Sequence, residues 1–299
     1  MEKFDVIIIG GSYAGLSAAL SLARLSKKIM VIDNGKPCNQ TVRKSYNFLT
    51  QNGNSPQQIV KTAKEQILAY PTVRFWDDKV IEVNGEDGDF EVKTVSGHEF
   101  AAKKILFATG VRDILPEIDG YSACWGTSIV HCPYCHGYEF SGKKAAILAE
   151  GEAGRQLLNL LAPLHPELFL ICQNGDFEDS RKDSICLVEH SITSIEHQDG
   201  QLKSILLDDG SKIAAEVLYI NPEYEQHSSL PEAIGCEMTD KKMIFIDSDH
   251  QTSVPGVYAC GDCTSLMRSI ANAVAAGNLA GAIINKVLSE KPLLVPASN

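Results

Sequence analysis

The stretch Phe4-Asp-Val-Ile-Ile-Ile-Gly-Gly-Ser-Tyr-Ala-Gly15 decides the fold class of this chain. A segment of strand length, apolar except for Asp5, leads into Gly10-Gly-Ser-Tyr-Ala-Gly15, which stands where a phosphate-binding turn would join a strand to a helix. A helical pattern of Leu and Ala follows, and the segment from Lys28 to Asp33 is typical of a second buried strand. Residues 4–33 therefore predict one strand–helix–strand unit.

The same pattern recurs in the middle of the chain. A strand is expected at 144–149, a helix at 154–164 and another strand at 167–172. A hairpin is expected at 201–210, and shorter strands and a long apolar helix lie elsewhere, at 104–110, 257–260 and 268–288. Alternating strands and helices of this kind predict an α/β fold with two Rossmann-like nucleotide-binding domains.

Length and composition fit two ordinary globular domains. The chain has 299 residues, 44% of them hydrophobic, and its 27 Lys and Arg against 38 Asp and Glu give a net charge of −11. The acidic balance disfavours a nucleic-acid partner. No apolar run approaches the roughly 18–20 residues that span a bilayer, and the N-terminus lacks a signal-peptide layout, so we expect a cytoplasmic protein without a membrane partner.

The first glycine turn has one departure from the G-x-G-x-x-G pattern, since Ser12 replaces the middle glycine. A small residue there still lets the backbone approach a pyrophosphate at the helix N-terminus. Asp33 ends the second strand 18 residues after Gly15 and is placed to accept hydrogen bonds from a ribose. The alternative is a tight turn that binds no ligand.

Two later segments favour FAD. Ala108-Thr-Gly110 and Gly256-Val-Tyr-Ala-Cys-Gly-Asp262 recur, in this order, in flavoproteins that hold an extended FAD. There the aspartate contacts the ribitol chain, and the helix starting near Arg268-Ser-Ile270 directs its positive end at the flavin. The predicted FAD residues are Gly10, Gly11, Ser12, Ala14, Gly15, Asp33, Asn39, Val80, Ala108, Thr109, Gly110, Gly261, Asp262, Ser269 and Ile270.

Cys132-Pro-Tyr-Cys135-His136 is the predicted catalytic segment. Two thiols three positions apart can close a small disulfide loop, and His136 can take or give a proton near neutral pH. The alternative is a zinc site that adds Cys260 and Cys263. That second pair straddles Gly261 and Asp262, which are needed for the ribitol, and the long gap between the pairs is not typical of a zinc ribbon, so no metal is predicted.

These motifs together resemble the low-molecular-weight thioredoxin reductase group of flavoprotein disulfide oxidoreductases over nearly the whole chain. The segment Cys132-Pro-Tyr-Cys-His-Gly-Tyr-Glu139 is most similar to the branch with gliotoxin-type dithiol oxidases, because His136 stands where the usual reductases carry aspartate. The resemblance implies homodimers and a discontinuous FAD domain at 1–112 and 244–299, with the dithiol domain inserted at 113–243. It also implies that Cys135 faces the flavin, Cys132 exchanges with substrate and His136 is the acid/base.

The second nucleotide site departs from NADPH-using relatives. The turn reads Ala149-Glu-Gly-Glu-Ala-Gly154, in which Glu150 and Glu152 bring negative charge to the expected pyrophosphate position. After the next strand, Cys172-Gln-Asn-Gly-Asp176 offers no Arg or Lys before Arg181 to hold a 2′-phosphate. NADPH is therefore predicted to bind weakly or not at all, the alternative being an unusual grip by backbone and distant basic residues.

The leading functional hypothesis is an FAD-dependent thiol–disulfide oxidoreductase without firm NADPH use. As an oxidase it would take a small dithiol and pass electrons to O₂. In the reverse direction a ferredoxin would be the donor and a thioredoxin-like protein the acceptor. Because ferredoxins are acidic, and this chain is acidic too, ferredoxin binding would need a local basic patch on its surface. The alternatives are a conventional NADPH-dependent thioredoxin reductase and a flavin-binding redox sensor without turnover.

Overall fold

The computed structural model describes residues 2–172 and 186–290, which divide into two compact units. The first unit comprises the residues up to 38, 57–112 and those from 225 onward, and the second comprises 39–56 and 113–224. The predicted limits differ from this division at two segments. Residues 225–243 belong with the first unit because Leu230 and Cys236 pack into its core, and residues 39–56 belong with the second.

The first unit is built on a seven-stranded sheet with the order β3-β2-β1-β6-β5-β4, and β17 pairs with β6. The pairs of β1 with β2 and β6, of β2 with β3 and of β6 with β17 are parallel, whereas β4–β5 and β5–β6 are antiparallel. The strand bounds are Lys3–Ile9 for β1, Ile29–Asp33 for β2, Val73–Asp77 for β3, Val80–Glu86 for β4, Asp89–Thr94 for β5, Glu99–Phe107 for β6 and Val257–Ala259 for β17.

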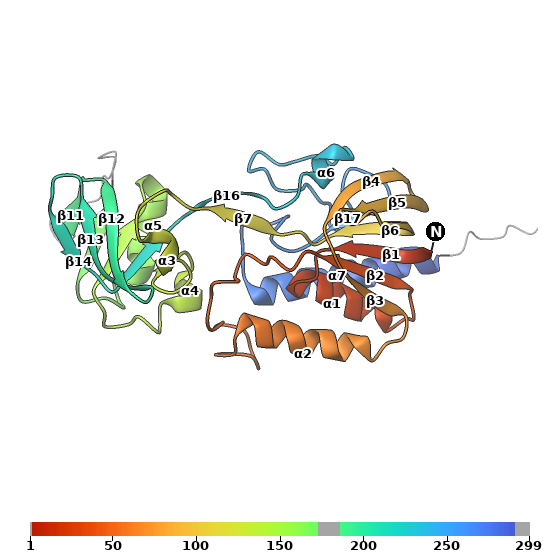
Figure 1. Cartoon of the computed structure of the whole chain (residues 1–299), viewed down its shortest axis with the longest axis horizontal. Helices are drawn as coiled ribbons and strands as arrows, with labels where there is room; N and C mark the ends of the chain where they lie inside the picture. The colour runs from red at the N-terminus through yellow and green to blue at the C-terminus, as the bar shows by residue number, and fades with distance from the viewer. Residues whose placement is uncertain (1, 173–185, 291–299) are drawn as a thin grey trace, which may run out of the picture. The chain divides into compact units, whose positions relative to one another are not determined.

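Both faces of this sheet are covered, which explains why β1 ends in four consecutive apolar residues, Val6 to Ile9. Val6 and Ile8 pack against helices α1, α2 and α7, whereas Ile7 and Ile9 point into a second core on the opposite face. Figure 1 shows the three helices together on one side of the sheet. Their bounds are Tyr13–Ala23 for α1, Pro56–Leu68 for α2 and Ile270–Ser289 for α7, and the short α6 on the other side is Leu230–Ala233.

The second unit combines a parallel five-stranded sheet of order β11-β10-β9-β15-β8 with an antiparallel sheet of order β12-β13-β14. The parallel strands are β8 (Ile129–Val130), β9 (Ala145–Leu148), β10 (Leu168–Ile171), β11 (Cys186–Val188) and β15 (Val217–Ile220). The antiparallel strands are β12 (Ile192–Gln198), β13 (Gln201–Leu207) and β14 (Lys212–Ala214). The helices are α3 (Tyr121–Cys124), α4 (Pro133–His136) and α5 (Gly151–Leu161).

The chain passes between the units at β7 (Val111–Ile114) and β16 (Glu223–Gln226), which pair in a two-stranded sheet. The predicted α/β fold class is confirmed: each unit contains a parallel sheet with a strand–helix–strand segment, β1-α1-β2 and β9-α5-β10. Among the described residues, no helix has the length and apolar character needed to cross a membrane.

Candidate active site

The turn between β1 and α1 leaves no room for side chains at two of its glycines. Gly10 has a φ of +109°, and a Cβ there would lie 2.3 Å from the carbonyl oxygen of Ala108. A Cβ on Gly15 would lie 1.9 Å from the carbonyl oxygen of Gly10. Ser12 is the N-cap residue of α1 but its side chain makes no capping hydrogen bond, so the first-turn N–H groups face outward for an anion.

Asp33 lies at the end of β2, directly beside this turn. A Cβ on Gly11 would lie 2.8 Å from the Cβ of Asp33 and 3.2 Å from its Oδ2, so the carboxylate approaches bare backbone. An acidic side chain in this position is the usual acceptor for a ribose hydroxyl in this fold. The uncapped helix N-terminus, the glycine turn and Asp33 together fit the adenosine diphosphate half of FAD.

The segments that follow β6 and β17 reach the same edge of the sheet. The backbone N–H of Cys260 donates to the carbonyl of Phe107 at 2.9 Å, which aligns the ends of the two strands. A Cβ on Gly261 would lie 2.7 Å from the Cβ of Ala14 in α1. The predicted residues on these segments therefore meet the first turn at the carboxyl ends of parallel strands, where open α/β sheets bind their ligands.

Asp262 is held by a residue that the sequence reasoning did not assign to the site. Its Oδ2 lies 3.8 Å from Nε of Arg268, and the two side chains are only 19% and 10% exposed. Ser269 then caps α7 by accepting a hydrogen bond from the N–H of Asn272 at 3.1 Å. The sequence did contain one indication of a role for Arg268, because a basic residue stands immediately before a helix that was expected to face the flavin.

Two further predicted FAD residues, Asn39 and Val80, are not on the segments described above. Asn39 belongs to the second unit, whereas the other predicted FAD residues belong to the first. Val80 begins β4 with its side chain 5% exposed in the first unit's core, so only its backbone can face a ligand. The FAD role of both residues stays a prediction.

Cys132 and Cys135 form a disulfide at the start of α4. Cys132 is the N-cap residue of this four-residue helix, and its Sγ accepts a hydrogen bond from the backbone N–H of Cys135 at 3.2 Å. The N–H of His136 donates to the carbonyl of Cys132, also at 3.2 Å. Both cysteines are partly exposed. The geometry thus presents a disulfide on a helical turn, with an imidazole on the next residue.

Aromatic side chains surround this turn. The ring of Tyr46 meets that of His136 edge to face, with centroids 6.4 Å apart and planes at 85°. Burial lowers the pKa of His136, which favours the neutral imidazole near neutral pH. Tyr134 and Tyr138 are 68% and 86% exposed, so two aromatic rings beside the disulfide are open to a substrate. Neither tyrosine was among the predicted site residues, although their positions beside the two cysteines could be read from the sequence.

Cys260 and Cys263 are buried free thiols. Cys260 packs in the core beneath the helices, whereas Cys263 packs in the core on the opposite face of the sheet. Burial raises the pKa of Cys260 well above its ordinary value and that of Cys263 to about 11. Two protonated thiols on opposite faces, together with a Cys132–Cys135 disulfide, do not offer the four thiolates of the zinc alternative.

The second predicted glycine turn joins β9 to α5 and carries an acidic side chain. Glu152 lies in the first turn of α5, where its Oε2 accepts from Nε of Arg155 at 3.0 Å and its Oε1 from Nε2 of Gln156 at 3.3 Å. A carboxylate paired with Arg155 therefore lies along the first turn of this helix, close to the N-terminus at which a dinucleotide would place its pyrophosphate. The predicted 2′-phosphate segment beyond Cys172, with Arg181, lies outside the described residues.

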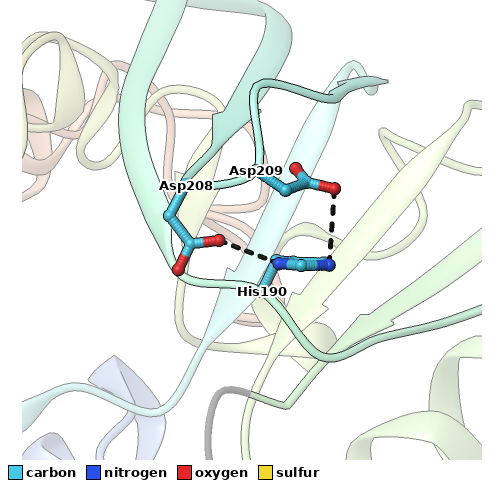
Figure 2. Close-up of side chains that lie close together, drawn as sticks. All are labelled: His190, Asp208 and Asp209. Atoms are coloured by element: carbon cyan, nitrogen blue, oxygen red, sulfur yellow. Dashed lines mark hydrogen bonds and ion pairs between the residues drawn. The ribbon is translucent and has the colours of Figure 1, made fainter.

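His190, Asp208 and Asp209 form a surface cluster in the second unit (Figure 2). Nδ1 of His190 lies 2.9 Å from Asp208 Oδ1, and Nε2 lies 3.3 Å from Asp209 Oδ2. The two carboxylates thus contact opposite nitrogens of one ring. We interpret the cluster as a surface group held by one hydrogen bond, from His190 to Asp208, and one ion-pair contact, from His190 to Asp209.

Comparison with known proteins agrees with this arrangement. A family model described as pyridine nucleotide-disulphide oxidoreductase matches residues 4–149 and 181–277. The chain is 30% identical to the thioredoxin reductase tcpT of Claviceps purpurea, over 93% of this chain and 92% of that protein. The crystal structure of an oxidoreductase from Agrobacterium tumefaciens is similar at a TM-score of 0.88 and 35% identity, covering 96% of this chain and 100% of that one.

A putative thioredoxin reductase, TrxB from Bacillus anthracis, is also similar, at a TM-score of 0.90 and 26% identity over 95% of this chain and 98% of that chain. The chain therefore belongs to the pyridine nucleotide-disulphide oxidoreductase family. Within that family it is a thioredoxin reductase-like enzyme that acts on sulfur groups, and the resemblance stated from the sequence is confirmed.

Proposed function

We propose that this chain is an FAD-dependent thiol–disulfide oxidoreductase that uses NADPH weakly or not at all. The observation that carries the proposal is the carboxylate of Glu152 at the N-terminus of α5, held there by Arg155 and Gln156. The family match also leaves out residues 150–180, which contain α5 and β10. The match thus leaves out the part of the second unit that would bind a dinucleotide and includes the disulfide of Cys132 and Cys135.

FAD would be held by the β1–α1 turn, Asp33 and the segments after β6 and β17, whose geometry fits it. When bound, FAD supplies an acceptor or donor of two electrons and exchanges them with a partner such as O₂. The chain's own contribution is disulfide exchange. A substrate thiol loses its proton to His136, its sulfur bonds to Sγ of Cys132, and the Cys132–Cys135 bond breaks with Cys135 leaving as a thiolate.

The second substrate thiol then gives its proton to the departing sulfur of Cys132 as its own sulfur bonds to the first substrate sulfur, so a substrate dithiol becomes a disulfide and the protein gains two electrons and two protons, one on Cys132 and one on His136. A small dithiol would meet a partly exposed disulfide with the exposed rings of Tyr134 and Tyr138 on the same segment. In the reverse direction the same atoms would reduce a disulfide on a thioredoxin-like protein. A neutral His136 suits the oxidation of a dithiol, because it can accept the proton of the attacking thiol.

NADPH is expected not to bleach the flavin absorbance of the anaerobic protein at stoichiometric concentration. The physical reason is that Glu150 and Glu152 repel the pyrophosphate charge. The measurement is a titration that follows the visible flavin band, with dithionite as the control for reducibility. Stoichiometric bleaching by NADPH would contradict the proposal and favour the conventional reductase.

A charge-neutralising double variant, E150Q with E152Q, tests the stated cause. It should bind NADPH about tenfold more tightly than the unmodified chain, which corresponds to about 1.4 kcal/mol. E167Q removes an exposed carboxylate of the same unit outside the turn and should leave the affinity unchanged. Equal affinities in all three proteins would show that the acidic turn is not what weakens NADPH binding. Absence of turnover with any dithiol or disulfide, despite bound FAD, would favour the redox sensor.

A further inference from the structure

Residues 39–56 form a loop of the second unit that is held by hydrogen bonds within its own backbone. The N–H of Ser45 donates to the carbonyl of Asn54, and the N–H of Gly53 donates to the carbonyl of Ser45, both at 2.8 Å. Ser45 is 6% exposed. These bonds close the loop on both sides of Tyr46, so its backbone is fixed next to the residue that carries the ring.

The beginning of the same loop rests on the segment before β8. A Cβ on Gly126 would lie 2.5 Å from Oγ1 of Thr41 and 3.3 Å from the side chain of Val42. This close approach needs a glycine at 126 and anchors the loop in the second unit. The loop is therefore attached at its start and closed around Tyr46, and it delivers the Tyr46 ring to the edge-to-face contact with His136.

We propose that Tyr46 is a positioning residue that orients His136 and keeps water from its ring during thiol–disulfide exchange. This inference rests on the proposed function, in which His136 accepts the thiol proton. The edge-to-face contact restrains the imidazole ring, and the backbone bond from the His136 N–H to the carbonyl of Cys132 fixes the helical turn that carries it. An oriented imidazole beside a disulfide is what proton transfer from an attacking thiol requires.

The charged and titratable groups around His136 agree with this role. Its own turn contributes the Cys132–Cys135 disulfide, which does not titrate, and the exposed carboxylate of Glu139. The loop contributes Tyr46, whose pKa is raised by burial and by the charge of Glu139, so its hydroxyl stays protonated. Burial is the cause that lowers the pKa of His136. Removing the tyrosine ring should admit water and return that pKa toward the value of a free imidazole.

The test compares Tyr46→Ala, Tyr46→Phe and Leu49→Ala, the last being a control at a position that is 87% exposed in the same loop. The readout is the rate at which dithiothreitol reduces Cys132–Cys135, measured by rapid alkylation and mass spectrometry as a function of pH. This readout does not require flavin turnover. NMR titration of the His136 ring provides its pKa independently of any rate.

Tyr46→Ala should exchange about fivefold more slowly than wild type near pH 6, because less of its His136 is neutral there, and within about twofold of it near pH 8.5. Its His136 pKa should be higher than in wild type, whereas Tyr46→Phe and Leu49→Ala should match wild type. An unchanged profile and pKa in Tyr46→Ala would overturn the inference, as would a Phe variant as slow as the Ala variant.

His136→Ala separates this inference from the proposed function. In this variant the exchange rate should lose the pH dependence that arises from His136, which is the part of the profile that Tyr46→Ala shifts. If His136→Ala exchanges at the wild-type rate with the wild-type profile, the proton-accepting role of His136 fails, and the proposed exchange step fails with it. If only Tyr46→Ala is without effect, the role of His136 stands and the role of Tyr46 is rejected.

Discussion

Cys132→Ser and Cys135→Ser are each expected to retain bound FAD and to lose at least about 10³-fold in turnover with every dithiol or disulfide substrate. Serine cannot form the disulfide that the exchange step breaks, and an alkoxide is not available near neutral pH to replace a thiolate. The two cysteines lie in the second unit, whereas the β1–α1 turn and Asp33 lie in the first. The loss should therefore leave the flavin spectrum intact.

The measurement is steady-state oxidation of a small dithiol, with the flavin absorbance of each purified variant recorded beside it. Cys186→Ser is the matched control, because Cys186 is an exposed free thiol of the same unit, at the start of β11. It should retain wild-type activity. Undiminished turnover in both the Cys132 and the Cys135 variant would reject the dithiol mechanism, and loss of FAD in either would place that cysteine in the flavin site.

The sequence predicted the parts of the fold that are buried on both faces. The apolar runs Val6–Ile9 in β1 and Ile29–Ile32 in β2 are buried because helices cover one side of the sheet and a second core covers the other, so both strands could be predicted from the sequence pattern. The predicted start of α5, at Gly154, was three residues too late. Glu150 and Gly151 were expected in the turn before the helix, but Glu150 is its N-cap residue and the helix begins at Gly151.

The polar loop of residues 39–56 could not be placed from the sequence. It has no periodic apolar pattern, and its anchoring depends on long-range contacts such as that of Thr41 with Gly126. The same limit applies to the candidate site. The Cys132–Cys135 pair and the glycine turns are local motifs and were assigned. Tyr46 and Arg268 act through contacts with His136 and Asp262 that only the folded chain specifies.

The second large effect is expected from Gly277→Ala, in the middle of α7. Helix propensity alone predicts that this substitution stabilises the protein by about 1 kcal/mol, since alanine is the better helix former. The packing predicts the opposite sign. A Cβ on Gly277 would lie 2.0 Å from the carbonyl oxygen of Ala14 and 2.9 Å from its Cα, both on the backbone of α1. No side-chain rotation can relieve a contact with backbone atoms.

The two helices are also fixed to each other by hydrogen bonds, which limits their ability to separate. Oγ of Ser17 donates to the carbonyl of Val274 at 2.7 Å, and Nδ2 of Asn285 donates to the carbonyl of Ser21 at 2.9 Å. Moving α7 outward to admit a methyl group would break these bonds or bend the helix. Gly277→Ala should therefore lower the free energy of unfolding of the first unit by about 3 kcal/mol or more.

FAD retention should fall in the same variant, because the contact presses on Ala14, one residue before Gly15 in the turn that is proposed to hold the pyrophosphate. The measurement is denaturant unfolding together with the ratio of flavin to protein absorbance after gel filtration. Asn278→Ala makes the next residue, on the exposed side of α7, into alanine and should be neutral or slightly stabilising. If the Gly277→Ala protein is as stable as the Asn278→Ala protein, α1 and α7 must lie farther apart than this packing requires. The position of the β1–α1 turn against α7 would then have to be revised as well.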